Sequence, residues 1–233
     1  GIGRRTSMSD ISGSSRWDYD KEGRAIKLQK TVDANTYKVE WAYDAMDRVK
    51  SIIYPNLKQV NFYYNNAGLA ESIDGFVLHA DYNAARQPTA ITFSNPMTTQ
   101  FDYYPENQRL KSIVTTSWQD LRYEYDIVGN VKKIIDAAHS VAKDYNYDDL
   151  DRLISGDGNS YEYNAIGNIM RANGITQQYS PAKPHALLND GTNTYFYDGC
   201  GNMLSGAGRG ISYDPENRPI TIIRNGITTT FVY

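Results

Sequence analysis

A six-residue pattern that begins with tyrosine recurs along the chain, and it restricts the possible folds more than any other feature. Each of the ten copies begins with Tyr, and the second residue is Asp or Asn in nine of them. The third and fourth residues vary, the fifth is mostly Gly, Asp or Asn, and the sixth is mostly Arg or Asn. They begin at Tyr19, Tyr43, Tyr64, Tyr82, Tyr104, Tyr125, Tyr147, Tyr163, Tyr197 and Tyr213. A repeat this short indicates one small supersecondary unit, copied in tandem.

Each position of the pattern favours a bend in the backbone. Asp and Asn at the second position accept hydrogen bonds from N–H groups just ahead and so initiate turns. Gly, Asp and Asn at the fifth position tolerate the positive φ that a chain reversal needs. The residues predicted to shape these bends, with a structural role and no catalytic one, are Tyr19, Asp20, Gly23, Tyr43, Asp44, Tyr125, Asp126, Gly129, Tyr147, Asp148, Tyr163, Gly167, Tyr197, Asp198, Gly201, Tyr213 and Asp214.

The segments between the bends read as strands. A second aromatic residue lies two positions before the tyrosine in seven copies, and a spacing of two places both rings on one face of a strand. Most copies are separated by 16 to 24 residues, which accommodates two short strands and two turns. One interval of 34 residues is divided by Tyr179, which would begin a degenerate copy. The sequence therefore predicts an all-β fold of tandem hairpins in one continuous, curved antiparallel sheet.

The repeats also suggest domain boundaries. We expect residues 1–16 to be a tail or the end of a preceding repeat, and residues 17–233 to form an array of about ten or eleven repeats. The final residues, Phe231-Val232-Tyr233, repeat the aromatic-x-tyrosine pattern without the bend that follows it elsewhere. We expect from this that the array continues in the natural protein.

Composition excludes several function classes. The net charge is −3, with Lys and Arg spread thinly, so the chain lacks the basic face typical of nucleic-acid binding. No apolar run reaches the roughly 18 residues of a membrane-spanning helix. The single cysteine, Cys200, excludes an intrachain disulfide and multi-cysteine zinc sites.

No residue stands out as a catalytic, cofactor-binding or metal-binding candidate. His79, His139 and His185 are isolated in sequence, and Cys200 lies inside one bend. Six aspartates occupy the same position of the repeat, so one structural role explains them better than an acid–base pair does. We therefore predict that the chain is not an enzyme and needs no cofactor. An alternative interpretation of the tyrosines is that exposed rings on a concave face bind sugars.

These motifs resemble the YD repeats of the Rhs family, which includes bacterial Rhs polymorphic toxins, Tc toxin B and C components, wall-associated proteins and teneurins. The resemblance runs from about Trp17 to Tyr233, and the segments Pro184-His185-Ala186-Leu187-Leu188 and Tyr195 to Asn202 look like a late part of a bacterial array. It implies a strip of strands that spirals into a shell around a C-terminal toxin or effector domain.

The resemblance also implies partners and location. The partners would be the C-terminal effector domain and neighbouring repeats of the parent protein, which would be secreted or at the bacterial cell surface. The family's autoproteolytic motif is not matched, because Asp214-Pro215 is followed by Glu216-Asn217. The alternative function is an adhesion module that binds a cell-surface carbohydrate or protein.

Overall fold

The computed structural model describes residues 3–11, 13–32 and 34–233, and within them every regular element is a β-strand. The prediction of an all-β antiparallel fold is therefore confirmed. The chain divides into two compact units: residues 1–123 with 135–141, and residues 124–134 with 142–233. Among the described residues there is no helix that could cross a membrane.

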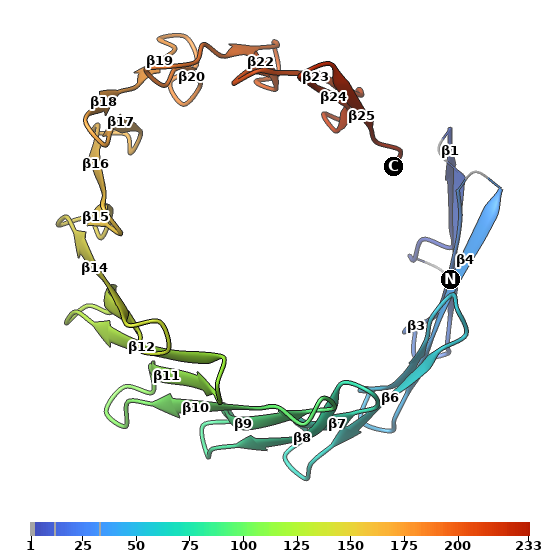
Figure 1. Ribbon diagram of the computed structural model, residues 1–233. Coiled ribbons are helices and arrows are strands. Elements are labelled where there is room, and N and C mark those ends of the chain that lie inside the picture. Colours follow the sequence, from blue (N-terminus) through green and yellow to red (C-terminus); the bar gives the residue numbers. More distant parts are fainter. Residues whose placement is uncertain (1–2, 12, 33) are drawn as a thin grey trace. The chain divides into compact units, whose positions relative to one another are not determined.

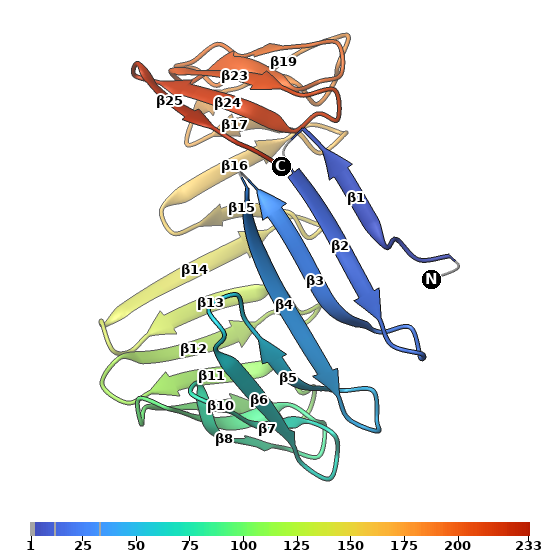
Figure 2. The same cartoon turned by 90° about the vertical axis from the view of Figure 1, so that its right-hand side faces the viewer.

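Unit 1 is a meander in which each strand pairs antiparallel with the next (Figure 1). Its strands are β1 (Ser7–Asp10), β2 (Gly13–Tyr19), β3 (Ala25–Val32), β4 (Asn35–Tyr43), β5 (Val49–Ile53), β6 (Gln59–Tyr64), β7 (Ala70–Ile73), β8 (Val77–Tyr82), β9 (Pro88–Phe93), β10 (Thr98–Tyr103), β11 (Leu110–Thr115) and most of β12 (Gln119–Tyr125). Figure 2 shows β2, β3 and β4 side by side, as their pairing requires. Within this unit the ribbon bends progressively from strand to strand.

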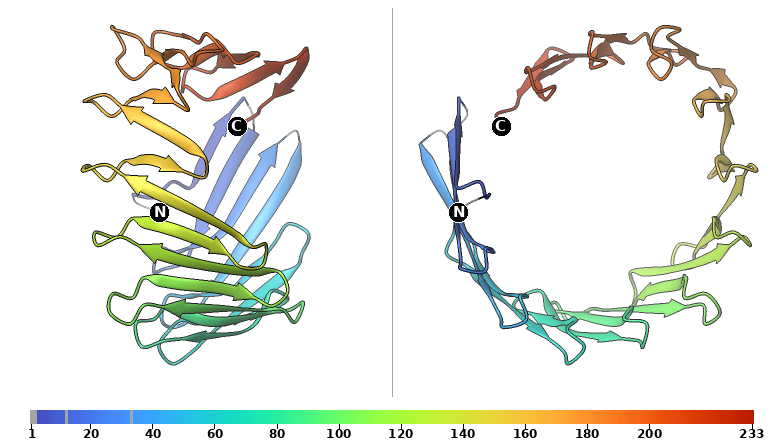
Figure 3. Two further views of the ribbon diagram at one scale, coloured as in Figure 1. Left: turned by 60° about the vertical axis from the view of Figure 1, so that its left-hand side comes forward. Right: turned by 180° about the vertical axis from the view of Figure 1, so that it is seen from behind.

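Unit 2 continues the same pattern with shorter strands (Figure 3). Its strands are β14 (Val141–Tyr147, apart from its first residue), β15 (Leu153–Gly156), β16 (Asn159–Tyr163), β17 (Ile169–Ala172), β18 (Ile175–Thr176), β19 (Gln178–Tyr179), β20 (Leu187–Asn189), β21 (Phe196–Tyr197), β22 (Met203–Gly206), β23 (Arg209–Tyr213), β24 (Pro219–Arg224) and β25 (Ile227–Thr230). Strand β13 (Val131–Asp136) is divided between the units. Strands β1–β18 belong to one sheet, β19 and β20 to a second, and β21–β25 to a third.

The strands at the N-terminus begin earlier than the predicted start of the array. Ser7–Asp10 pairs with Gly13–Arg16 as a hairpin, within the segment that was expected to be a tail or the end of a preceding repeat. The division at residue 16 stays a prediction.

Each unit is a single layer of strands with little interior. Among the described residues, only Val60 and Ala80 are buried apolar side chains. Exposure alternates along the strands instead: in β10, Phe101 and Tyr103 are half-buried while Gln100 and Asp102 are exposed. This is the alternation expected when one face of a sheet packs and the other faces water. Stability in such a layer depends mainly on contacts between neighbouring strands.

Two strand ends in unit 2 share a close packing of an aromatic ring on glycine. Gly156 lies under the ring of Tyr145, and Gly206 lies under the ring of Tyr195. A Cβ on these glycines would lie 2.4 and 2.2 Å from the respective ring carbons, Cδ1. The two segments match at a spacing of 50 residues, from Tyr145-Asn146-Tyr147-Asp148 to Tyr195-Phe196-Tyr197-Asp198. The same local packing is therefore built twice.

Candidate functional site: the tyrosine and turn rows

The motif tyrosine closes the strand before each bend, and its hydroxyl reaches back to the preceding repeat. Tyr43 Oη donates to the carbonyl of Ala25 at 2.8 Å, and Tyr64 Oη donates to the carbonyl of Val49 at 2.7 Å. The acceptor is usually the residue directly after the preceding hexapeptide. The same donation to a backbone carbonyl is made by Tyr19, Tyr82, Tyr103, Tyr147, Tyr163, Tyr179, Tyr197, Tyr213 and Tyr233, at 2.6–3.1 Å. We call this set of bonds the tyrosine row.

One assignment from the sequence is wrong. The sequence pattern predicts Tyr104 as the motif tyrosine of its copy, but Tyr103 ends β10 and donates to the carbonyl of Pro88 at 2.9 Å. Tyr104 instead occupies the position of the turn aspartate in a longer loop, and its hydroxyl donates to the carbonyl of Tyr123. The signal was present in the sequence, because Phe101 lies two residues before Tyr103.

Each bend is built on its second residue. In the bend after β4, the Asp44 N–H donates to the Arg48 carbonyl at 2.9 Å. Asp44 Oδ1 accepts the N–H groups of Met46 and Arg48 at 2.8 and 3.0 Å, and Oδ2 accepts Arg48 Nε at 2.7 Å. The pairing register shifts just before the bend, because Ala42 pairs with Ser51 while Tyr43 pairs with Val49. The aspartate thus holds a loop and a bulge together.

The other predicted aspartates make equivalent bonds in their own bends. Asp20, Asp126, Asp148, Asp198 and Asp214 each accept the backbone N–H four residues ahead, at 2.8–3.0 Å. The fifth residue of the bend has a positive φ in nine of the ten bends, including Arg86 (64°), where the sequence departs from Gly, Asp or Asn; in the longer bend after Tyr103 the positive φ falls on the sixth residue, Gln108 (60°). The backbone therefore keeps this geometry even where the residue does not favour it.

The sixth residue connects one bend to the next. Asn130 Nδ2 donates to Asp126 Oδ2 in its own bend at 3.0 Å and to Asp151 Oδ1 in the next bend at 2.8 Å. Asn202 makes the corresponding bond to Asn217 Oδ1 at 2.8 Å. Where the residue is arginine, its guanidinium also covers the next motif tyrosine: Arg24 over Tyr43, Arg48 over Tyr64, Arg152 over Tyr163 and Arg218 over Tyr233, at 4.3–4.8 Å from the ring centre. We call these linked bends the turn row.

The electrostatics of the bends favours ionised aspartate and protonated tyrosine. The hydrogen bond from the Arg48 side chain lowers the pKa of Asp44, and Arg152 does the same for Asp148. Burial acts to raise the pKa of Asp126, but N–H donors from Gly129 and Asn130 bring it below its ordinary value. Burial raises the pKa of the tyrosine hydroxyls at Tyr64, Tyr103 and Tyr147. Both shifts preserve the charged acceptors and the hydroxyl donors of the two rows.

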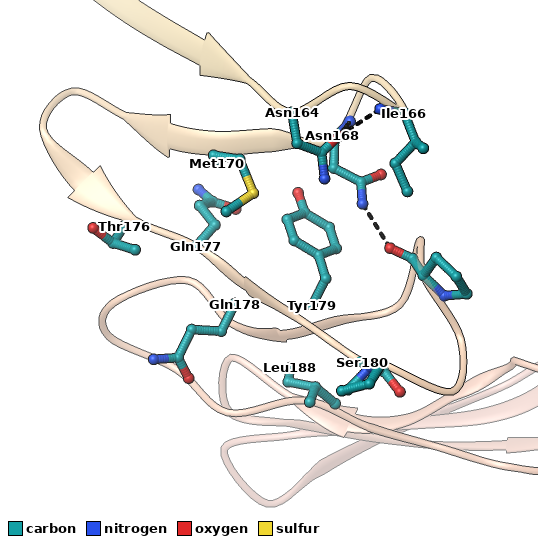
Figure 4. Close-up of a pocket in the computed structure, with 12 residues that line it drawn as sticks. Asn164, Ile166, Asn168, Met170, Thr176, Gln177, Gln178, Tyr179, Ser180 and Leu188 are labelled. Carbon is teal, nitrogen blue, oxygen red and sulfur yellow. Dashed lines mark hydrogen bonds between the residues drawn. The ribbon is translucent and has the colours of Figure 1, made fainter.

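The two rows change form in the long interval between Tyr163 and Tyr197. Tyr179 takes its place in the tyrosine row, but the segment that follows forms a wider loop, from Ser180 to Ala186. Lys183 Nζ from this loop contacts the carbonyls of Asp198 and Gly199, the latter at 3.1 Å. Lysine thus replaces the usual Arg or Asn link to the next bend. A pocket lies beside this loop (Figure 4).

Comparison with solved structures supports this architecture. A TcdB2–TccC3–TEV crystal structure matches 93% of this chain and 14% of its own, at 18% identity and a TM-score of 0.77. A TcdB2–TccC3–Cdc42 crystal structure matches 91% of this chain and 14% of its own, at 19% identity and a TM-score of 0.75. The structure of the Photorhabdus luminescens Tc holotoxin pore, which carries a TccC3 mutation, matches 91% of this chain and 14% of its own, at 19% identity and a TM-score of 0.73. The chain has their fold.

That fold agrees with the YD-repeat resemblance of the sequence, and this chain spans about a seventh of the length of these solved chains. No protein-family model and no curated protein sequence matches the chain. The fold places the predicted bend residues in one recurring arrangement along the sheet, each in its own hairpin.

The three histidines and the single cysteine, which the sequence does not support as catalytic or metal-binding residues, lie apart from one another. His79 contacts Asp81, His139 contacts Asp136, and His185 Nδ1 lies 2.7 Å from Asn168 Oδ1. Cys200 is exposed in its bend. In the part of the chain that the structure describes, no group of three or more His, Cys, Asp or Glu side chains is arranged to hold a metal ion. Sequence reasoning missed the carbonyl acceptors of the tyrosine row, since a backbone acceptor leaves no residue-type signal.

Proposed function

We propose that this chain is a section of the wall of a YD-repeat shell in a longer bacterial toxin-type protein. The observation that carries the proposal is the single-layer sheet of linked hairpins, which has the fold of chains from Tc toxin complexes. Its work is mechanical: the wall encloses and shields a C-terminal effector domain of the same protein, which is its principal partner. The parent protein is secreted or displayed at the cell surface.

The packing of the sheet supports a wall. A globular enzyme buries a core and carries its site in a cleft, whereas here two apolar side chains are buried among the described residues. The tyrosine and turn rows bond each hairpin to its neighbour, so a long single layer holds its form without a second layer above it. Such a layer separates two spaces.

The side chains with the chemistry of acids and bases are already used in the bends. Asp44, Asp148 and Asp214 each accept two or more N–H groups from their own loops and pair with arginine. Each sits in a different hairpin, and a glycosidase-type mechanism needs two carboxyl groups facing one substrate. In this proposal the chain has no catalytic role.

Limited proteolysis of the natural full-length protein tests the proposal. The C-terminal region is expected to survive protease at least tenfold longer within the intact protein than when it is expressed alone. Opening the wall with Gly156→Val and Gly206→Val, where a side chain would collide with Tyr145 and Tyr195, should remove that protection. Gly210→Val is the matched control, because a Cβ there meets nothing within 4 Å.

Two results would contradict the shell. One is a C-terminal region cleaved equally fast in both contexts. The other is a chain that adheres to glycans or proteins on intact cells while the rest of the protein stays protease-accessible, which would establish the adhesion alternative.

A further inference from the structure

The pocket beside the Ser180–Ala186 loop has no role in the shell proposal. It has a volume of about 590 Å³ and lies between the bend after β16, the strand β17 and the strands β18–β20. In Figure 4, Asn164, Met170 and Gln177 are grouped around the ring of Tyr179. Pockets of this size accommodate small ligands.

The lining is uncharged. Its twelve residues include no Asp, Glu, Lys, Arg or His. The apolar part includes Met170, Leu188 and the ring of Tyr179, together with Ile166, Pro181 and Pro184; Met170 and Leu188 are 38% and 36% exposed. The Tyr179 hydroxyl is already bonded to the Ile169 carbonyl, so the ring face is what this residue offers to a ligand. An ionic ligand would find no counter-charge here.

Amide side chains on the lining have unused hydrogen-bonding capacity. Asn164 Oδ1 accepts the N–H groups of Ile166 and Asn168, while its Nδ2 has no partner among the described residues. In two other bends the sixth-position asparagine, Asn130 or Asn202, donates back to the second residue, but here Asn168 Nδ2 donates to the Pro184 carbonyl at 2.6 Å. The side chains of Gln177 and Gln178 also make no hydrogen bond within the described part of the chain.

The backbone around the pocket is occupied. Gln177 N–H donates to the Met170 carbonyl at 2.8 Å, Ser180 N–H donates to the Ala186 carbonyl at 2.9 Å, and β19 pairs with β20. A peptide that adds as an extra strand therefore lacks the main-chain partners it needs. A purely apolar ligand would leave the amides without partners when it covers them.

We propose that this pocket binds an uncharged saccharide of one or two rings. Sugar hydroxyls both donate and accept, which matches the side-chain amides of Asn164 and Gln177, grouped around the Tyr179 ring in Figure 4. The C–H face of a pyranose ring matches the apolar surface of Met170, Leu188 and Tyr179. The inference does not depend on the shell, because the pocket is formed by two successive repeats within unit 2.

NMR titration of the whole chain with neutral mono- and disaccharides tests this site. Glucose, galactose, N-acetylglucosamine, maltose and cellobiose are the probes, with an uncharged flexible peptide in parallel. At least one saccharide is expected to shift amide signals within residues 164–188. The Gln177→Ala variant should weaken that binding at least tenfold while the circular dichroism spectrum stays unchanged, since this amide makes no hydrogen bond within the described part of the chain.

Gln100→Ala is the matched control, because Gln100 is an exposed glutamine on β10 in unit 1. It should leave the saccharide affinity unchanged. The proposal is overturned if none of the saccharides shifts these signals at 50 mM (about the weakest binding worth assigning to a site). It is equally overturned if only the peptide binds, or if the Gln177→Ala variant and the Gln100→Ala control bind saccharide alike.

Discussion

At the scale of single residues, the tyrosine row explains why tyrosine outnumbers phenylalanine, with 20 residues against 6. A ring alone would pack on the sheet face, but the hydroxyl also supplies a donor to a carbonyl of the preceding repeat. A hydroxyl bonded in this way is already occupied, so a ligand at such a tyrosine can use only the ring face.

We expect Tyr64→Phe to lower the free energy of unfolding by about 1 kcal/mol, the usual net value of one hydrogen bond. The variant keeps the ring beneath Arg48 and removes only the bond to the Val49 carbonyl. Tyr63→Phe is the adjacent control, because Tyr63 is 49% exposed and should change little. Urea denaturation of both variants measures the difference, and equal stability would exclude a contribution from the row.

The turn aspartates predict a stability that depends on acid pH. Their pKa values are lowered in the folded chain, so they stabilise it fully above the ordinary aspartate pKa of about 4. That contribution is lost as pH falls further, through the folded-state values. The unfolding free energy should thus decrease below about pH 4.

Asp148→Asn tests this effect at one bend. Asparagine already serves at this position in Asn65 and Asn164, so the loop should persist. The slope of stability against pH in the acid range should become shallower, because the ionised partner of Arg152 is gone. Denaturation at a series of pH values compares the variant with the unaltered chain, and an unchanged slope would assign the acid effect elsewhere.

The bends could be predicted from the sequence, whereas the contacts between repeats could not. The bends at Asp44 and Asp148 could be read directly, because Asp and Gly have strong local preferences that act within six residues. The acceptors of the tyrosine row could not, because they lie 10 or more residues away and are backbone atoms. The sequence cannot tell whether Tyr103 or Tyr104 is the motif tyrosine from residue type alone, because the two are adjacent and identical. They differ only in the face of the strand on which their rings lie.

At the scale of elements, the packing of rings on glycine fixes the short strands of unit 2. Gly156 ends β15 and pairs with Tyr145 of β14. A methyl group there would meet the Tyr145 ring 2.4 Å from Cδ1, which is far inside van der Waals contact. The ring can shift only by disturbing the strand that carries the next bend.

We expect Gly156→Ala to destabilise the chain by about 1–3 kcal/mol, the range for overpacking at a tight site. Gly210→Ala, in β23, should be neutral or slightly stabilising. A Cβ at this position meets nothing within 4 Å, and alanine lowers the backbone entropy of the unfolded chain. Thermal unfolding of the two alanine variants provides the comparison. A Gly156 variant as stable as the control would mean that the ring is not confined.

At the scale of the whole molecule, the repeat period made the fold class predictable, but the irregular interval was not. Tyr179 was recognised as a degenerate copy, yet the pocket next to it arises from a loop whose Pro181 and Lys183 match no motif position. The repeat period predicts only the features that all copies share, whereas the pocket depends on a loop that differs from the other copies.

Because only two apolar side chains are buried among the described residues, each hairpin is stabilised mainly by its neighbours, and the chain should unfold region by region. Hydrogen exchange of the Gly156→Ala variant should therefore accelerate across β14–β17 and leave the protection of β3–β9 unchanged. Mass spectrometry of exchanged peptides resolves the two regions. Acceleration of equal size in both would indicate one cooperative unit instead.

The link from each tyrosine to a backbone carbonyl has an evolutionary consequence. Because every peptide group presents the same oxygen, the joint between hairpins makes no demand on which side chain the earlier hairpin carries there. Recombination that duplicates, deletes or exchanges whole hairpins should then yield a compatible joint, so such arrays can change length and surface quickly while their framework persists.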